Sequence, residues 1–279
     1  MASWPGLRPD QRPYRGTAWY YAEYRDRPSL EFARQLAKTL GWSPDGRLLD
    51  LGAGPAQVSL RLAPFVGEVV VMDPEPDMVA EGERRAAAAG ARNLTFVVGG
   101  SDDLAAIAPE LGPLAGAVIS QAFHWLRDQD SVLRALDTLL DPNAGAVAIV
   151  GFVKEPDPNG WLGEPPWDAV GQILREHLQN AEPGPHPRGR HDPFPDILGR
   201  SAFPDVELIT HEYDAVIHPS VEAAIGFQYT LSNTLAQLGD DRDAFEAEVR
   251  AALADADTSP IHVRLIDSAL VGRRPDGRR

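Results

Sequence analysis

Residues 48–56 constrain the fold more than any other part of this chain. An apolar run ends around Asp50, the chain turns through Gly52 and Gly54, and apolar residues at helical spacing follow from 57 to 62. A strand, a tight turn and a helix in this order are typical of a doubly wound α/β domain that binds a nucleoside at its first crossover. Because glycine has no Cβ, such a turn can adopt unusual dihedral angles and a ligand can approach its backbone closely.

The same stretch indicates which kind of nucleoside binds. A dinucleotide-binding turn has a third glycine, which seats a pyrophosphate at the helix N-terminus. Gln57 stands at that position here, and Asp50 lies just ahead of the turn, where its charge would repel a phosphate. The sequence therefore predicts a cationic ligand without phosphate.

Residues 50–54, Asp-Leu-Gly-Ala-Gly, resemble motif I of the class I S-adenosylmethionine (SAM) methyltransferases, whose usual form is acid-x-Gly-x-Gly-x-Gly. Ala56 replaces the last glycine of that motif. The resemblance implies SAM as the cofactor and S-adenosylhomocysteine as its product. The predicted cofactor contacts in this segment are Asp50, Gly52, Ala53 and Gly54. The alternative is a glycine-rich turn that only shapes the fold.

A second segment has the pattern of a buried parallel strand that ends in an acid. Residues 68–73 are mostly β-branched, and Asp73 closes the run. Nucleoside-binding sheets place an acceptor for the ribose hydroxyls at this point, so we expect Asp73 to bind the ribose. A helix N-cap is the alternative role. The resemblance also places Pro74 and Met78 at the cofactor, with Met78 against the adenine; an ordinary core position is the alternative for Met78.

A third strand is predicted over residues 93–98. After it, the resemblance implies that the backbone of Ser101 meets the adenine and that Asp102 accepts a hydrogen bond from its amino group. Gly100 stands where the family often has Asp. Asp102 has an alternative role as the cap of a helix that begins at Leu104.

The fourth predicted strand, residues 116–120, runs into Gln-Ala-Phe-His-Trp at 121–125. This resembles the Gln-Ala-x-His-Trp signature of small-molecule methyltransferases related to trans-aconitate methyltransferase. The resemblance places Gln121, Ala122 and Phe123 at the cofactor. His124 falls at the carboxyl end of the strand, where it is a candidate general base, a positioning group or a packed side chain.

Two further segments are expected to cover the site. Residues 18–25 resemble the Ala-x-x-Tyr-x-x-Tyr-Arg opening of the same subgroup, in which this segment forms a lid. Tyr21 and Arg25 are candidates for binding the methionine carboxylate or the substrate, because a guanidinium forks onto a carboxylate. Residues 154–200 are expected to form a cap; its possible substrate walls are Trp161, Trp167 and Phe194. His186 and His191 in this cap have no coherent metal spacing, and we predict no metal site.

The remaining pattern predicts a helix over 131–140 and strands over 146–150, 205–211 and 263–271. The fold class is therefore α/β, a Rossmann-like sheet of seven strands that is mostly parallel and ends in an antiparallel hairpin. We divide the chain into lid helices (1–45), a SAM-binding core (46–152), a cap (153–203) and the C-terminal part of the sheet (204–279).

Composition excludes several classes of function. The formal charge of −15 argues against a nucleic-acid partner. The chain has no cysteine, hence no disulfide and no thiolate metal site, which is compatible with the cytoplasm. The sequence has neither a stretch of about 18 apolar residues nor an apolar signal core, so we expect no membrane partner. A monomer or homodimer is expected.

The predicted activity is transfer of the SAM methyl group by SN2 displacement to an O, N or C nucleophile of a small metabolite, with specialised metabolism as its setting. The alternative is a methyltransferase fold that binds SAM but catalyses another reaction, such as a cyclisation. An NAD(P)-dependent oxidoreductase is disfavoured by Gln57 and by the His-Trp pair.

Overall fold

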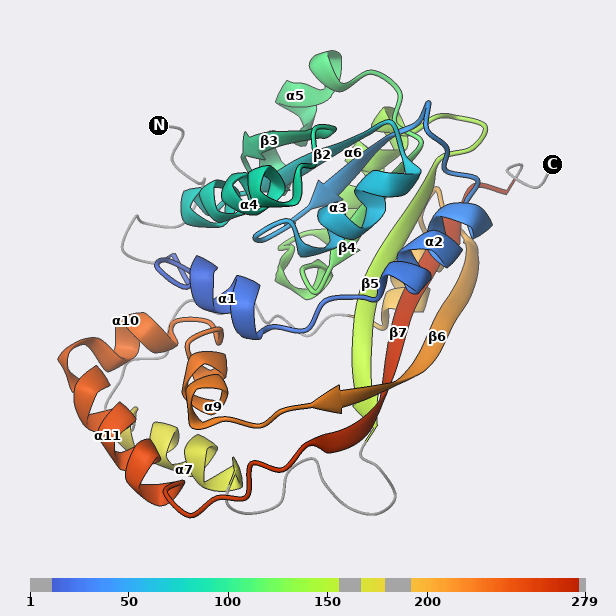
Figure 1. The fold of residues 1–279 in the computed structure, drawn as a ribbon. Coiled ribbons are helices and arrows are strands. Elements are labelled where there is room, and N and C mark those ends of the chain that lie inside the picture. Colours follow the sequence, from blue (N-terminus) through green and yellow to red (C-terminus); the bar gives the residue numbers. More distant parts are fainter. Residues whose placement is uncertain (1–11, 156–166, 179–191, 276–279) are drawn as a thin grey trace.

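The computed structural model describes residues 12–155, 167–178 and 192–275. Seven strands in these ranges form one sheet with the order β3-β2-β1-β4-β5-β7-β6 (Figure 1). Neighbouring strands pair in parallel except around β7, which is antiparallel to both β5 and β6. The predicted seven-stranded methyltransferase-type sheet, with its C-terminal antiparallel hairpin, is confirmed.

The predicted strands are present, and the C-terminal three are longer than expected. The first four differ from prediction by at most one residue at either end, whereas the last three extend by two to six residues at an end. The extensions form because β6 and β7 pair along their whole lengths, where backbone hydrogen bonds hold the strands beyond the buried core. The observed bounds are β1 Arg47–Leu51, β2 Glu68–Asp73, β3 Leu94–Val98, β4 Gly116–Ser120, β5 Ala146–Glu155, β6 Asp205–Ile217 and β7 Ile261–Arg273.

Helices cover both faces of the sheet, because successive strand residues point to opposite sides. Leu48 and Val69 face the helices α2 (Leu30–Thr39) and α3 (Gln57–Leu62). Helix α4 (Pro76–Ala89) packs beside α3, where Gly82 lies next to Ala56 and Phe96. Leu49 and Val70 belong to the core on the opposite face. The helices on that face are α5 (Leu104–Leu111), α6 (Gln129–Leu139) and α8 (Phe194–Gly199).

Four more helices form a separate lobe at the extended ends of β5, β6 and β7 (Figure 1). We call this group, with its own hydrophobic cluster, the helical lobe. Tyr20, from α1 (Ala18–Tyr24), packs against the cluster, so α1 connects the lobe with the rest of the chain. The helices of the lobe are α7 (Trp167–His177), α9 (Val221–Gln228), α10 (Thr234–Leu238) and α11 (Arg242–Ala252).

The helical lobe combines two segments that the sequence analysis treats separately. Helix α7 comes from the expected cap, whereas the other three helices lie between β6 and β7. Helix α8, also from the expected cap, packs on the sheet instead, and Phe194 makes an edge-to-face contact with Phe123 at 4.9 Å between ring centroids. Trp161, His186, His191 and the side chain of Trp167 lie outside the described residues.

Across the described ranges, no helix combines the length and the apolar character needed to cross a membrane.

The start of β4 tolerates no side chain. A Cβ on Gly116 would lie 2.6 Å from Nε1 of the buried Trp42. We therefore expect Gly116→Ala to lower the free energy of unfolding by about 1–3 kcal/mol through overpacking. Gly199→Ala is the matched control, because a Cβ there would meet nothing within 4 Å. Urea denaturation of both variants measures the effect, and equal midpoints would contradict this packing.

Candidate functional site

The candidate site lies at the carboxyl ends of β1, β2 and β4. The chain order of the strands reverses between β1 and β4, and open α/β sheets bind ligands at such a switch point. A cavity of about 390 Å³ opens there, a size suited to a small molecule. The sheet side of its wall is formed by Leu51, Gly52, Gly54, Asp73, Pro74, Glu75, Met78, Gly100, Ser101, Asp102, Ser120, Gln121 and Ala122. The outer side is formed by Pro13, Tyr14, Tyr21, Trp125, Leu126 and Arg127.

The turn after β1 depends on its two glycines. Gly52 and Gly54 have φ of +69° and +53°, which other residues adopt only with strain. The N–H groups of Gly52 and Ala53 both donate to the carbonyl of Met72, at 2.8 and 3.1 Å, which fixes the turn against β2. A Cβ on Gly52 would lie 2.6 Å from that of Ala122 in the loop after β4. The two loops therefore meet with no space for a side chain.

Two residues that are not glycine also have left-handed backbones here. Ala56, at the position of the family's last glycine, has φ +62°, and Gln121 has φ +51°. The conformation of Ala56 gives the physical reason why a glycine suits this place. Gln121 is held by its N–H, which donates to the carbonyl of Val150 at 3.1 Å. Such strained residues gather at functional sites, where the surrounding structure imposes them.

Asp73 is buried at the end of β2 and is oriented by the backbone. Its two carboxylate oxygens accept hydrogen bonds from the N–H groups of Gly54, at 2.8 Å, and Glu75, at 2.9 Å. Burial raises the pKa of Asp73 to about 6, against the lowering effect of these bonds. The N-cap of α4 is Glu75, which also pairs with Arg12. Asp73 therefore does not occupy the N-cap position, the alternative that its sequence left open.

Asp50 lies beneath the turn and is absent from the cavity wall. Its side chain is fully buried, and its Oδ2 accepts a hydrogen bond from Ser59 Oγ at 2.6 Å. Its Oδ1 has no hydrogen-bond partner. Burial raises the pKa of Asp50 to about 7. Ala53 is also absent from this wall and lines a smaller adjoining cavity, together with Asp26 and Gln57.

The predicted adenine side contributes Met78, Ser101 and Asp102 to the cavity wall. Ser101 and Asp102 lie in a short 3-10 helix, η3 (Ser101–Asp103). Its capping carboxylate belongs to Asp103, which accepts a hydrogen bond from the Gly100 N–H at 2.8 Å. Asp102 therefore remains available at the wall.

The His-Trp segment divides between the core and the cavity. Residues 123–125 form the 3-10 helix η4 (Phe123–Trp125). Phe123 is buried against the core, whereas Trp125 lies on the cavity wall. His124 is half-buried, lies outside both cavity walls and has its ring centroid 5.8 Å from that of Trp125.

Aromatic rings cover the outer side of the cavity, and sequence reasoning identified only part of this cover. The ring of Tyr14 makes edge-on contacts with Trp125, at 5.5 Å between centroids, and with the predicted Tyr21, at 6.0 Å. Burial raises the pKa of Tyr14 and that of Tyr21, so both hydroxyls stay protonated. Tyr14 belongs to no recognisable motif. The only feature of the sequence that could have indicated its role is that it is an aromatic residue close to the predicted lid.

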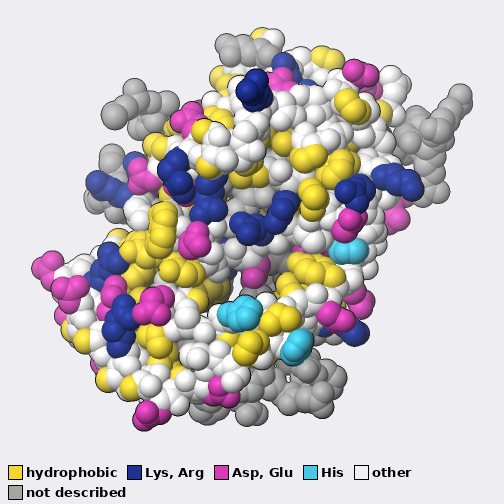
Figure 2. Space-filling view, in the orientation of Figure 1, with side chains coloured by type: hydrophobic (Ala, Val, Ile, Leu, Met, Phe, Trp, Pro, Cys, Tyr) yellow, Lys and Arg dark blue, Asp and Glu magenta, His cyan; other side chains and the backbone are white. Residues whose placement is uncertain are grey.

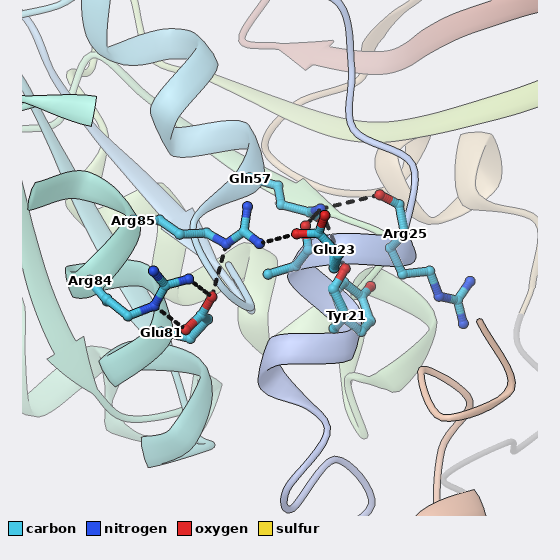
Figure 3. Close-up of polar contacts among 8 residues, drawn as sticks. Tyr21, Glu23, Arg25, Gln57, Glu81, Arg84 and Arg85 are labelled. Atoms are coloured by element: carbon cyan, nitrogen blue, oxygen red, sulfur yellow. Dashed lines mark hydrogen bonds and ion pairs between the residues drawn. The ribbon is translucent and has the colours of Figure 1, made fainter. Parts of the chain in front are cut away.

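Helix α1 is tied to α3 and α4 by two groups of contacts (Figure 3). Gln57 Nε2 donates to the carbonyls of Tyr21, Ala22 and Arg25 at 3.3–3.5 Å. Arg85 of α4 pairs with Glu23 of α1 at 3.1 Å and with Glu81 of its own helix. Gln57, which stands where a dinucleotide-binding turn has its third glycine, thus holds the end of α1.

Arg25 differs from the other predicted site residues because it contacts both α1 and the helical lobe. Its guanidinium carbon lies 5.4 Å from the ring centroid of Tyr21 and 5.0 Å from that of Phe227. It does not belong to the walls of the two cavities. Among the described residues, no group of three or more His, Asp or Glu side chains could hold a metal ion.

Comparison with known proteins identifies the part of the chain that forms this site. Residues 48–143 match the family model described as a methyltransferase domain. This segment, about a third of the chain, has the sequence of a methyltransferase domain. Its cofactor is therefore SAM, and motif I, Asp73 and the loop after β4 all lie within it.

Curated relatives match a similar length of sequence. The 23S rRNA (uracil(1939)-C(5))-methyltransferase RlmD of Shewanella sp. strain MR-4 is 33% identical over 102 residues, which cover 33% of this chain. The matched region is only 23% of the length of that relative.

Solved structures share the fold of the methyltransferase domain and its surroundings. A proposed type II methyltransferase from Anaeromyxobacter dehalogenans superposes with a TM-score of 0.58 at 24% identity, covering 90% of this chain and 98% of that one. The YcgJ protein of Bacillus subtilis superposes with a TM-score of 0.50 at 18% identity, covering 88% of this chain and 99% of that one.

The buried acid below the turn predicts a pH-dependent stability. The unfolded chain loses the Asp50 proton near pH 3.8, whereas the folded chain keeps it until about pH 7. The free energy of unfolding should therefore fall as the pH rises between these values, by at most about 4 kcal/mol for this group.

Urea denaturation at pH 5 and pH 8 measures this loss, and Asp50→Asn should make it smaller. Part of the pH dependence of stability should remain in the variant, because the pKa of Asp73 is also raised. An identical pH dependence in wild type and variant would contradict the assignment.

Proposed function

We propose that this protein is a SAM-dependent methyltransferase that acts on a small-molecule acceptor through an O, N or C nucleophile. The observation that carries the proposal is the cavity at the switch point, whose wall includes the glycine turn, the oriented carboxylate of Asp73 and a cover of aromatic rings. The resemblance of residues 121–125 supports the trans-aconitate-related subgroup, with specialised metabolism as its setting. The absence of cysteine supports a cytoplasmic location.

The residues present fit the cofactor. Each oxygen of Asp73 uses one lone pair for a backbone N–H, which leaves others for the ribose hydroxyls. Gly52 and Gly54 leave the backbone open to a ligand, and Gln121 and Ala122 lie opposite them on the same wall. Pro74, Met78, Ser101 and Asp102 supply apolar and polar contacts for the adenine. Asp50, Ala53 and Phe123 would support this shell from behind.

When bound, SAM supplies a methyl group that is already electrophilic because it is attached to a positively charged sulfur. The protein must then align the acceptor and keep water out. Alignment alone contributes up to about 7–11 kcal/mol in well-oriented intramolecular reactions. The rings of Tyr14, Tyr21 and Trp125 line the outer side of the cavity, where they would shield a bound cofactor from water. His124 is our candidate for removing a proton from the acceptor.

A small acceptor is favoured over RNA, although the name of the curated relative RlmD specifies ribosomal RNA. The matched segment is only the cofactor-binding part of the chain. The formal charge of −15 opposes a polyanion. Figure 2 shows a band of basic side chains across the middle of one face, with acidic side chains beside and below it.

Calorimetric titration with SAM, S-adenosylhomocysteine and NAD, followed by assay of S-adenosylhomocysteine formation, tests the proposal. Binding of both sulfur nucleosides without NAD, together with methylated product, supports it. SAM binding with a rearranged but unmethylated product would favour the alternative of a cyclase-like reaction.

Asp73→Asn should weaken SAM binding by roughly 10- to 150-fold, the equivalent of about 1.5–3 kcal/mol for hydrogen bonds to a charged group. Glu83→Gln, an exposed change on α4, is the control and should bind SAM as wild type does. Titration calorimetry gives both affinities. Unchanged affinity in a folded Asp73→Asn protein would remove Asp73 from the ribose site.

His124→Ala should lower turnover by about 10²–10⁴-fold with SAM affinity retained, because a general base acts on the acceptor and not on the cofactor. Steady-state turnover and calorimetry separate the two effects. A loss below tenfold would exclude His124 as the base, and a loss of SAM binding would assign it to the cofactor shell.

A further inference from the structure

Arg25 is placed between the two parts of the molecule. It follows the last residue of α1 and points from there toward the segment after α9 (Figure 3). Tyr21, whose ring centroid lies 5.4 Å from the guanidinium carbon, lines the cofactor cavity. Phe227, whose ring centroid lies 5.0 Å from the same carbon, belongs to the helical lobe. The cation therefore lies where the cofactor site meets the lobe.

The hydrogen-bonding capacity of this guanidinium is largely unused. It has five N–H donors, of which Nη2 makes one long hydrogen bond, 3.4 Å, to the carbonyl of Thr230. Its Nε is buried and has no partner. Arg25 as a whole is half-buried, and a buried donor such as its Nε is costly unless an acceptor reaches it.

Eleven other arginines in the described part of the chain form ion pairs with acids, whereas several, such as Arg27 and Arg61, do not. Arg12, Arg47, Arg85 and Arg242 each contact a glutamate. None of the ion pairs formed among described residues includes Arg25. Among the described arginines without an ion pair, Arg25 is the one whose side chain has a buried nitrogen with no hydrogen-bond partner.

The surroundings of Arg25 indicate which kind of group would bind its free N–H donors. The guanidinium lies close to two aromatic rings, and it presents its N–H groups at its edge, in its own plane. A planar carboxylate matches that edge with two parallel hydrogen bonds. A locally unpaired cation also offsets the repulsion that a chain of charge −15 exerts on an anion.

We propose that Arg25 binds a carboxylate of the methyl acceptor, so that the acceptor is a small carboxylic acid held between the cofactor cavity and the helical lobe. This inference rests on the proposed methyltransferase function. The acceptor is favoured over the cofactor as the source of the carboxylate for two reasons. Arg25 is absent from the cofactor cavity wall, and its contacts with Phe227 and Thr230 connect it to the lobe.

The test compares a panel of hydroxy, amino and dicarboxylic acids with their matched primary amides as acceptors. Formation of S-adenosylhomocysteine is the assay. Wild type should favour an acid over its amide by at least about tenfold. Arg25→Gln should raise KM for that acid by roughly 10- to 100-fold, the effect of losing charged hydrogen bonds, with kcat and the Kd for SAM within about twofold. Arg25→Lys should restore part of the acid preference.

Arg34→Gln is the matched control, because Arg34 is an exposed arginine of α2 that pairs with Glu31, and it should keep the acid preference. Equal use of acids and amides by wild type would overturn the inference while leaving the methyltransferase function intact. Loss of SAM affinity in Arg25→Gln, equal to the rise in KM, would assign the carboxylate to the cofactor and also overturn it. Wild type that binds no SAM would instead refute the proposed function.

Thermal unfolding shows whether each variant is folded. If Arg25→Gln does not fold, Arg25→Lys and the acid-to-amide comparison on wild type decide the question. Methylation of no acid of the panel, in a protein that binds SAM, would overturn the inference.

Discussion

The site depends on a close approach of two loop backbones at the switch point of the sheet. Gly52 has a left-handed backbone and no room for a Cβ, because Ala122 of the loop after β4 occupies the space. The carbonyl of Met72 holds the turn by accepting two N–H groups. The N–H of Gly54, in the same turn, orients Asp73 at the end of β2. One strained turn thus places the ends of three strands around a single cavity, and the strain is sustained by the parallel pairing on both sides of β1.

Helix α1 contacts both the core around this turn and the helical lobe. On the core side, Gln57 and the Arg85–Glu23 pair hold it. On the lobe side, Tyr20 accepts a hydrogen bond from Arg242. Gly226 of α9 comes so close to the ring of Tyr24 that a Cβ there would overlap it. A helix of seven residues has little stability of its own, so its position is set by these contacts. The cofactor cover and the lobe are therefore coupled through one short element.

The sequence was most informative where structure is local. The bounds of β2 and α3, and the places of Gly52, Gly54 and Asp73, follow from buried strands joined by tight turns. The far ends of β6 and β7 could not be predicted in the same way, because their hydrogen bonds come from a partner more than 40 residues away in the chain. Asp50 belongs to the predicted motif but lies beneath the turn, where Ser59 donates a hydrogen bond to it. The motif alone does not reveal this contact, so it could not show that Asp50 is turned away from the cavity. Tyr14 was missed because its place depends on ring contacts with Trp125, far along the chain.

The same difference between local and tertiary contacts separates the proposed cofactor site from the proposed acceptor site. Contacts to the cofactor come from turns directly after strands, where spacing in the sequence fixes geometry. The proposed acceptor side is assembled from α1 and the segment after α9, more than 200 residues apart, and no spacing rule connects Arg25 with Thr230. In the proposed assignment, acceptor specificity is set by the lobe and by the residues of α1 that face it, whereas the glycine turn and Asp73 determine only that a nucleoside binds.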